Sequence, residues 1–552
     1  MKKEIAIKTI RCDILCILII MGCEILFFHN ILFNDNLIGY RIDGRLVTFL
    51  TEHWYQVFQG KEGWTELPCF YPEEGILAYS DMMLLFALPF SFLRTAGMNM
   101  YSALKATTII FHVLGSVTLY YFMRKFIKVS GLLALLAVVC FSFSNGYNFI
   151  SGNIQMFALS LLPVLLIAIG LYVRNFERKY RYFAGIFIIV WLALLFYTAF
   201  YVGYFICLFA GITVVVFGGS AFLLRKQEWM RSSWNRIIRH WKEYIFYFML
   251  FILLMLPFVY LYLPALQDFG GRSWEELLGM FPSWKNICML NEKSDALAGF
   301  NPEVYNYKTG FPITDLIIYG FSGVYFCYTL KKKIKKDGWS KEEYVLLSGM
   351  VVIAISFILI IQFRGITLWY FVYKLIPGAS AIRAVLRWLN FISLPMAIYL
   401  AIIMAYLGKT VLGKKRKIYA RICLLGLIAI VYLGNYCVTG VGSGWTASGE
   451  ILFEESVAVP PSDCEVMYIV DQENVMDVEY QELQMDAWAV ALKYDLKTIN
   501  GYSGQVPNGW DLLDPSANDI DQKVKDWLAK NNKSLQGVYA YDIGQNEWEK
   551  LN

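Results

Sequence analysis

The chain alternates between long apolar blocks and short polar segments, and each block is continuously apolar instead of alternating residue by residue. A block of about 18 or more apolar residues crosses the hydrocarbon core of a bilayer as a helix. Continuous blocks also exclude a membrane barrel, whose strands alternate between apolar and polar residues. The pattern predicts eleven spans, near residues 13–33, 101–123, 131–149, 153–173, 182–198, 201–222, 244–264, 312–330, 343–362, 388–407 and 422–440.

Basic residues in the connections test this count. With eleven spans, the basic N-terminus and all the Lys- and Arg-rich loops fall on one side of the membrane, which the positive-inside rule makes cytoplasmic. Residues 82–93 are apolar but too few to span, and Pro89 interrupts them. Counting them as a span would place every later basic loop on the outer side of the membrane, so they are predicted to form a re-entrant or interfacial helix. The predicted topology places the N-terminus inside and the C-terminus outside.

Four polar segments then lie on the extracytoplasmic side: 34–100, 265–311, 363–387 and 441–552. The last of these carries a strand-like VMYIV at 466–470, helical stretches near 476–494 and 517–531, and a strand-like GVYAYDI at 537–543. The predicted fold is therefore a membrane all-α domain over residues 1–440, followed by a small extracytoplasmic α/β domain over residues 441–552.

Composition supports this division. Hydrophobic residues make up 57% of the chain and charged residues 17%, whereas a soluble domain has about 45–50% and about 25%. Residues 451–552 hold 7 lysines, no arginine and 19 acidic residues, a net charge of −12, while the first 450 residues carry +17. The basic clusters are short and lie between spans, so no nucleic-acid partner is predicted. The 11 cysteines show neither a disulfide framework nor zinc-ligand spacing.

The first outer segment begins with YRIDGR, in which Asp43 stands between Arg41 and Arg45 and Gly44 is expected to let the backbone turn. From Leu46 onward the sequence is amphipathic, which predicts a helix on the membrane surface. Arginines bind phosphate through paired hydrogen bonds, and a carboxylate can accept a proton from an attacking hydroxyl. An ordinary solvated loop, salt-bridged to itself, is the alternative interpretation.

Further candidates come from other outward-facing positions. Arg383 and Arg387 lie four residues apart, which predicts one helix face that either binds a lipid phosphate or anchors the helix to headgroups. Lys105 and His112 share a face in the second span, where ionisable groups suggest function, although Lys105 can also reach the surface. The outward-facing turn at 151–155 adds Asn153 and Gln155.

Motifs of soluble nucleotide-dependent enzymes are absent: the sequence contains no P-loop and no GxGxxG before a helix, and it also lacks HExxH and GxSxG. The predicted cytoplasmic loops are short and basic. A catalytic domain on that side is therefore not expected.

Several segments together resemble the GT-C superfamily of polytopic glycosyltransferases, and within it the bacterial YfhO-type branch. They lie in order along nearly the whole chain: GYRIDGR, YPEEGILAYSDMMLLFALPF, FSNGYNFISGNIQMFALSLLP, PGASAIRAVLRW and TINGYSGQVPNGW. The resemblance implies that an acid of the first outer loop, here Asp43, is the catalytic base. It also implies that basic residues hold the donor phosphate, with Arg383 as first choice ahead of Arg387, Arg41, Arg45 and Lys105.

The expected reaction is an inverting transfer of a sugar from a polyprenyl-phosphate donor to a cell-envelope glycan, lipid or protein acceptor outside the membrane. Many relatives carry a second acidic motif after span three, but this chain has Ser151-Gly152-Asn153 there, so a metal site is not assigned. A divalent cation stays open as a cofactor, with Asp81 or Asp295 as substitute ligands. A transporter or flippase of a lipid-linked sugar and a non-catalytic envelope assembly protein are the alternatives.

Overall fold

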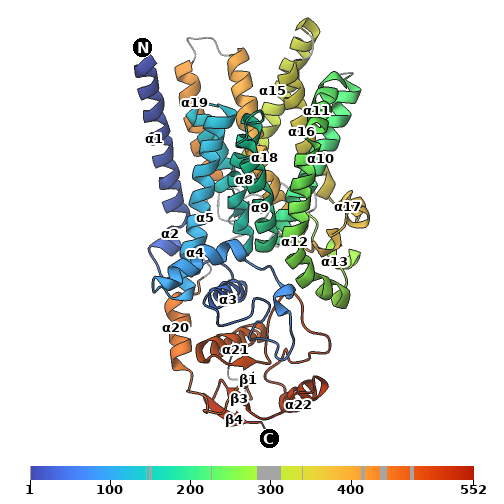
Figure 1. Cartoon of the computed structure of the whole chain (residues 1–552). Coiled ribbons are helices and arrows are strands. Elements are labelled where there is room, and N and C mark those ends of the chain that lie inside the picture. The colour runs from blue at the N-terminus through green and yellow to red at the C-terminus, as the bar shows by residue number, and fades with distance from the viewer. Residues whose placement is uncertain are drawn as a thin grey trace.

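The computed structural model describes residues 2–144, 146–147, 152–224, 227–282, 313–337, 340–411, 417–435, 444–472, 476 and 478–551. Ser151, Asp295 and most of the predicted 265–311 loop lie outside the described residues. Long helices run side by side through one part of the molecule, and a small sheet with its helices lies at the end opposite the N-terminus (Figure 1).

Seven stretches of the described chain are long and apolar enough to cross a membrane, which makes this a multi-pass membrane protein. Each overlaps a predicted span. The helices concerned are α5 (Met100–Phe122), α8 (Leu162–Arg174), α9 (Arg181–Thr198), α10 (Phe200–Leu223), α12 (Trp241–Phe269), α16 (Lys341–Ile360) and α18 (Arg387–Val411). The π-helix η2 (Met123–Ile127) follows α5 directly, and the 3-10 helix η3 (Ile154–Leu161) leads directly into α8.

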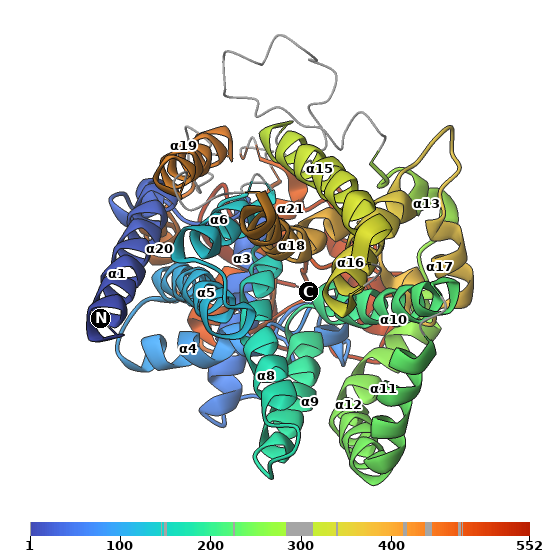
Figure 2. The same cartoon turned by 90° about the horizontal axis from the view of Figure 1, so that it is seen from above.

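The other four predicted spans coincide with helices that do not meet these criteria of length and apolarity. They are α1 (Lys2–Phe27), α6 (Gly131–Ser142), α15 (Ile313–Asp337) and α19 (Lys417–Asn435). The total of eleven spans stays a prediction. Helices α6 and α18 pack closely on each other, and Figure 2 shows the bundle from above.

Local sequence sets where several helices begin. The Asn99 side chain accepts a hydrogen bond from the Ser102 backbone N–H at the start of α5, and Ser340 and Glu343 form a reciprocal capping box at α16. Such caps satisfy backbone N–H groups that a helix start leaves without partners. Shorter helices occupy the connections: α2 (His29–Leu32), η1 (Ile76–Tyr79), α11 (Gln227–Arg239), α13 (Trp274–Leu278), α17 (Trp369–Leu375) and η6 (Ala379–Ala381).

The first outer segment forms α3 (Arg41–Phe58) and α4 (Leu84–Thr95), which lie across the end of the bundle (Figure 1). The expectation of a surface helix is wrong for α3, because every residue from Gly44 to Trp54 is buried. Helices α4 and α5 pack around it, together with α21 (Tyr480–Tyr494) of the C-terminal segment. Gly44 does not form a turn either. It is helical, and a Cβ there would lie 2.3 Å from the Trp445 ring, so glycine is needed for this close contact.

The C-terminal segment folds around a four-stranded sheet of order β2-β1-β3-β4, made of β1 (Val466–Val470), β2 (Lys497–Thr498), β3 (Val538–Asp542) and β4 (Glu547–Lys550). Strand β1 is parallel to β2 and β3, while β4 is antiparallel to β3. All five residues of β1 are buried, as expected for a central strand covered on both faces. Helices α20 (Ala447–Ser456), α21 (Tyr480–Tyr494) and α22 (Ile520–Lys530) complete this segment.

The first outer segment and the C-terminal segment are joined by backbone hydrogen bonds. The Thr498 N–H donates to the Pro68 carbonyl at 2.7 Å, and the N–H groups of Phe70 and Tyr71 donate to the carbonyls of Asn500 and Thr498, each at 2.9 Å. These bonds extend the pairing beside β2. The C-terminal segment is thereby fixed against the residues that lead to the end of the bundle, where most of the predicted site residues lie.

Candidate active site

Asp43 lies in the first turn of α3. The preceding Gly39 has a left-handed backbone (φ +91°), and the Tyr40 N–H donates to the Gly152 carbonyl at 3.3 Å, so the start of α3 meets the turn at 152–155. The Asn153 side-chain amide donates a 2.9 Å hydrogen bond to the Asp43 carboxylate. Burial raises the pKa of Asp43, while the charge of Arg387 and the Asn153 hydrogen bond act to lower it.

Arg387 is the first residue of α18, and its guanidinium lies over the Tyr201 ring at 5.0 Å from the centroid. Its charge acts on both Asp43 and Asp81. Within the described ranges, no acidic side chain pairs with Arg387 within 4 Å. A half-buried guanidinium without a carboxylate partner retains its hydrogen-bond donors for another anion, such as a phosphate.

Asp81 accepts a 2.9 Å hydrogen bond from the backbone N–H of Phe200, the first residue of α10. Burial raises the pKa of Asp81, and this hydrogen bond together with the Arg387 charge acts to lower it. Asp81 thus links the first outer segment to the start of α10. The charge of Arg387 acts on both Asp81 and Asp43.

A loop of the C-terminal segment reaches the same place. The charges of Asp43 and Arg383 both act on Tyr502. Burial has the largest effect on the pKa of the Tyr502 hydroxyl and raises it; the charge of Asp43 raises this pKa further, and the charge of Arg383 lowers it. The loop is held on either side, because the Gly501 N–H donates to Gln484 at 2.9 Å and the Arg272 guanidinium donates to the Gly504 carbonyl at 2.8 Å. Sequence reasoning named the segment that contains Tyr502 but gave that tyrosine no role, because a tyrosine in an aromatic-rich sequence carries no distinguishing signal.

The predicted helix face joining Arg383 and Arg387 is wrong, since α18 begins at Arg387 and Arg383 precedes it in an irregular segment. The Tyr201 hydroxyl accepts hydrogen bonds from the backbone N–H groups of Arg383 (2.9 Å) and Ala384 (3.1 Å), which fixes that segment without a helix. The exposed Arg383 side chain forms a 3.1 Å ion pair with Glu276. Arg387 therefore replaces Arg383 as the first choice for a phosphate ligand.

Arg41 and Arg45 contact the C-terminal segment on a different face of α3. Arg45 is fully buried between Glu450 (3.2 Å) and Asp486 (2.7 Å), and Arg41 pairs with Glu450 (2.8 Å) and Glu482. Because carboxylates already surround both guanidinium groups, we leave these two arginines out of the phosphate site.

The remaining predicted site residues are Lys105, His112 and Gln155. The Lys105 ammonium lies 3.5 Å from the Asn36 carbonyl, just before α3. His112 bonds to Glu24 (2.7 Å) and to the Ser142 carbonyl (2.8 Å) rather than to Asp43. The Gln155 side-chain oxygen, two residues from Asn153, is buried and has no hydrogen-bond partner among the described residues.

A divalent cation as cofactor stays a prediction, since its candidate ligand Asp295 lies outside the described residues. Over the ranges given above, no group of three or more His, Cys, Asp or Glu side chains is placed to hold a metal. The charge of Arg387 acts on both carboxylates of the site, Asp43 and Asp81. No step of the reaction proposed below is therefore assigned to a metal.

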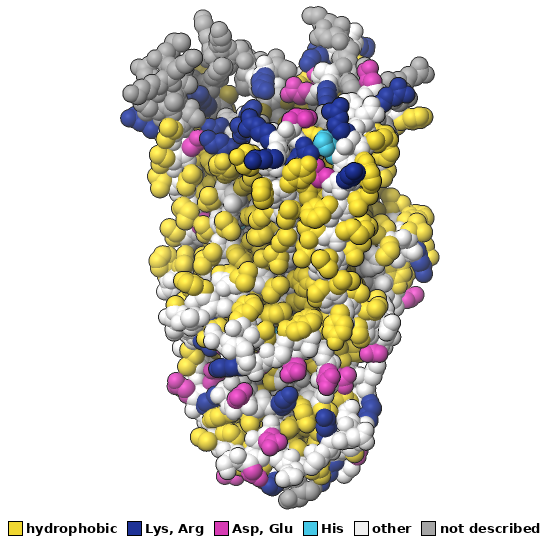
Figure 3. Space-filling model, in the orientation of Figure 1, with side chains coloured by type: hydrophobic (Ala, Val, Ile, Leu, Met, Phe, Trp, Pro, Cys, Tyr) yellow, Lys and Arg dark blue, Asp and Glu magenta, His cyan; other side chains and the backbone are white. Residues whose placement is uncertain are grey.

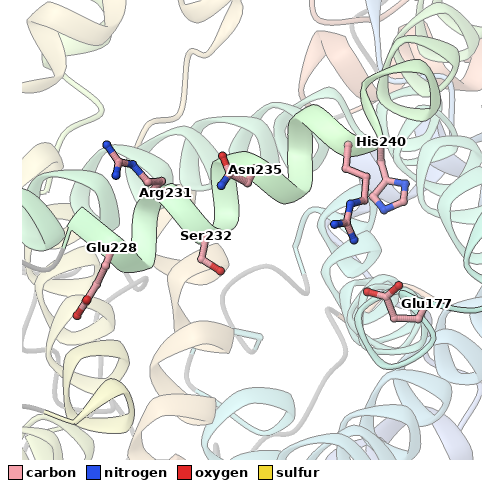
Figure 4. A pocket seen from close by; sticks show the side chains of 7 residues that line it. Glu177, Glu228, Arg231, Ser232, Asn235 and His240 are labelled. Carbon is pink, nitrogen blue, oxygen red and sulfur yellow. The ribbon is translucent and has the colours of Figure 1, made fainter.

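A pocket of about 710 Å³ (Figure 4) lies at α11, which stands at the end of the bundle opposite to α3 (Figure 1). It is lined by Glu177 from the turn between α8 and α9 and by polar residues of α11 and its end, namely Glu228, Arg231, Ser232, Asn235, Arg239 and His240. These lining residues are mostly exposed, whereas Asp43 and Arg387 are half-buried. The candidate residues Asp43 and Arg387 do not line this pocket.

No protein-family model matches the chain, and no curated protein matches it. Among solved structures it is similar to the oligosaccharyltransferase of Archaeoglobus fulgidus, crystallised with zinc and sulfate, at TM-score 0.46 and 13% identity over 96% of this chain and 67% of that one. It is also similar to ArnT from Cupriavidus metallidurans in the apo state, at TM-score 0.38 and 12% identity over 96% and 92%. Similarity at this level carries no argument about activity.

Proposed function

We propose that this protein is a membrane glycosyltransferase that moves a sugar from a polyprenyl-phosphate donor to a hydroxyl-bearing cell-envelope acceptor. The observation that carries the proposal is the grouping of Asp43, Asn153 and Arg387. They come from three separate parts of the chain and form a half-buried acid, its hydrogen-bond donor and an arginine without a carboxylate partner in the described structure.

In the proposed reaction Asp43 is the general base. As the acceptor oxygen attacks the anomeric carbon, its proton moves to the Asp43 carboxylate and the new C–O bond forms. The bond from the anomeric carbon to the phosphate oxygen breaks on the opposite side, which inverts the configuration. The lipid phosphate leaves with the bonding electrons, and Arg387 stabilises the charge on it.

Asp43 is suited to this role because burial raises its pKa, which brings a carboxylic acid closer to the basicity that proton transfer near neutral pH needs. Asn153 orients the carboxylate through one of its oxygens and leaves the other for the acceptor. Tyr201 holds the Arg387 guanidinium by stacking beneath it.

We further propose that the site faces the extracytoplasmic side. Lys and Arg side chains gather at the end of the bundle that carries the N-terminus, and a broad apolar belt follows, with acidic residues more frequent toward the other end (Figure 3). By the positive-inside rule the basic end is cytoplasmic. Asp43 and the C-terminal segment then lie outside the membrane, close to the lipid phosphate of a membrane-embedded donor.

A transporter would need a polar path through the middle of the bundle. His112 and Glu24 are buried in this region and hydrogen-bond to each other. Their other polar atoms also have partners within the protein: Glu24 accepts a 2.6 Å hydrogen bond from Ser116, and His112 bonds to a backbone carbonyl. Such a saturated network favours structural packing over a substrate path.

The test is turnover of radiolabelled polyprenyl-phosphate hexoses (glucose, galactose and mannose) by the full-length protein in nanodiscs, with and without envelope extract as acceptor. We expect sugar release or transfer from one of the donors, and its loss in Asp43→Asn. Asp511→Asn, which neutralises a carboxylate that is 86% exposed, is the matched control and should stay active. Turnover of none of the donors, or full activity of Asp43→Asn, would contradict the proposal.

A further inference from the structure

The three charged residues at the start of α3 point in two directions. Successive residues of an α-helix are about 100° apart, so Arg41 and Arg45 share a face and Asp43 lies roughly 200° away from each. The contacts agree with this geometry. Asp43 bonds to Asn153, whereas both arginines contact the C-terminal segment.

Three carboxylates receive the two arginines. Glu450 of α20 contacts both guanidinium groups, at 2.8 Å from Arg41 and 3.2 Å from Arg45. Asp486 of α21 lies 2.7 Å from Arg45 and 3.9 Å from Arg41, and Glu482 pairs with Arg41 alone. The side chains of Glu450 and Asp486 are only 4% exposed, so water screens these charges little.

The charged and titratable groups around Asp43 come from several elements. Arg387 of α18 and Tyr502 of the C-terminal loop interact with it electrostatically, and the charge of Arg387 also acts on Asp81. Lys105 of α5 and Arg383 before α18 are the neighbouring cations on elements packed nearby. Arg41 and Arg45 are close to Asp43 in sequence, yet neither is among the groups that shift its pKa.

We propose that Glu450, Glu482 and Asp486 are positioning residues for Asp43: they hold and neutralise Arg41 and Arg45 on the far face of α3, which prevents these arginines from becoming counter-ions of Asp43. The acidic C-terminal segment thereby contributes to the site in two ways: its loop with Tyr502 reaches the site, and its carboxylates neutralise the two arginines of α3. The catalytic consequence rests on the proposed function, in which Asp43 is the base. The electrostatic part is measurable without any substrate.

The test replaces Asp43 by a thiol that reports the local potential. In the full-length Asp43→Cys variant, the rate of iodoacetamide alkylation at position 43 is measured against pH by peptide mass spectrometry, which separates it from the native cysteines. Adding Glu482→Gln leaves Arg41 less compensated, so the pKa of the introduced thiol should fall by about 0.5 unit. Adding Arg41→Gln instead should raise it, and the double change should return it close to its starting value.

Glu482 is chosen because its side chain is 21% exposed and it pairs with Arg41 alone, so that its replacement leaves the fully buried Arg45 with both of its partners. Asp463→Asn is the matched control: it removes an acid from the same segment whose partner is Lys550, and it should not move the thiol pKa. Opposite shifts in Glu482→Gln and Arg41→Gln support the proposal. No shift, or shifts of the same sign, would overturn it.

The two proposals fail separately. If Asp43→Asn keeps full transferase activity while the thiol pKa moves as expected, the assignment of Asp43 as base is wrong and the electrostatic inference stands. If Asp43→Asn is inactive but the thiol pKa does not move, the positioning role of the acidic residues is wrong and the assignment of Asp43 as the base stands.

Discussion

The Asn153 side-chain amide donates a 2.9 Å hydrogen bond to the Asp43 carboxylate across 110 residues of sequence. This contact joins the first outer segment to the turn before α8, the position at which the chain has no second acidic motif. In the proposed reaction, the Asn153 amide orients this single carboxylate, which acts as the base.

The pH dependence of transfer follows from this contact and from burial. Asp43 must be deprotonated to act as a base, and burial raises its pKa above the ordinary 3.8. Activity should therefore decline on acidification at a higher pH than an exposed aspartate would give. Asn153→Ala removes a hydrogen bond that favours the charged form, so the acid limb should move to still higher pH. The measurement is kcat/KM against pH for both proteins; an acid limb that moves to lower pH in the variant would contradict this assignment.

Arg387 should matter more than Arg383. If Arg387 stabilises the leaving phosphate, Arg387→Gln should lower kcat by about 10²–10³-fold, as for other single transition-state donors. Arg383 is half-exposed and paired with Glu276, so Arg383→Gln should cost less than about tenfold. Steady-state kinetics with the donor identified above compares the two. Equal losses would argue against a special role for Arg387.

Arg45 should be important for stability. It is fully buried between Glu450 and Asp486, so Arg45→Met removes the nearest cation of Asp486 and one of the two cations that contact Glu450, and it should cost about 3–5 kcal/mol. Arg41 is 32% exposed, so water partly compensates Arg41→Met, and the loss should be clearly smaller. Thermal unfolding in detergent, followed by tryptophan fluorescence, measures both. A larger loss for Arg41→Met would show that the burial of Arg45 is not the deciding factor.

Gly44 should not tolerate a side chain. A Cβ at this position would lie 2.3 Å from the Trp445 ring and 3.0 Å from the Ile38 carbonyl. Gly44→Ala should destabilise the protein by about 1–3 kcal/mol, the usual cost of overpacking. Gly60→Ala is not a suitable control because Gly60 has φ +71°; Gly22→Ala is better, since the added Cβ there meets nothing within 4 Å. The same unfolding assay applies, and equal stability of Gly44→Ala and Gly22→Ala would contradict the packing argument.

Apolar blocks placed the long helices well, because a run of leucine, isoleucine and phenylalanine long enough to span has few other stable conformations. The strand at 466–470 and helix α21 also lie where their patterns indicate. The surroundings of α3 could not be read in this way. Its burial depends on α21, more than 400 residues later in the chain, and an amphipathic pattern does not say whether lipid or protein covers the apolar face.

The candidate site could be predicted only in part, because its residues also depend on partners that are distant in the sequence. Asp43 stood out because it lies between two arginines, yet those arginines turn away from it to Glu450, Glu482 and Asp486. Arg383 and Arg387 were assigned to one helix because their spacing fits one, but the Tyr201 hydroxyl holds the backbone at Arg383 outside the helix. Both differences arise from partners distant in sequence, which spacing alone does not reveal.

The most direct test of the central claim is a cryo-electron microscopy structure of the full-length protein in nanodiscs with a non-hydrolysable polyprenyl-phosphonate hexose. The account predicts the phosphonate within hydrogen-bond distance, about 3 Å, of the Arg387 guanidinium and the sugar facing Asp43. Ligand bound at the other end of the bundle, or with its phosphonate away from Arg387, would contradict it.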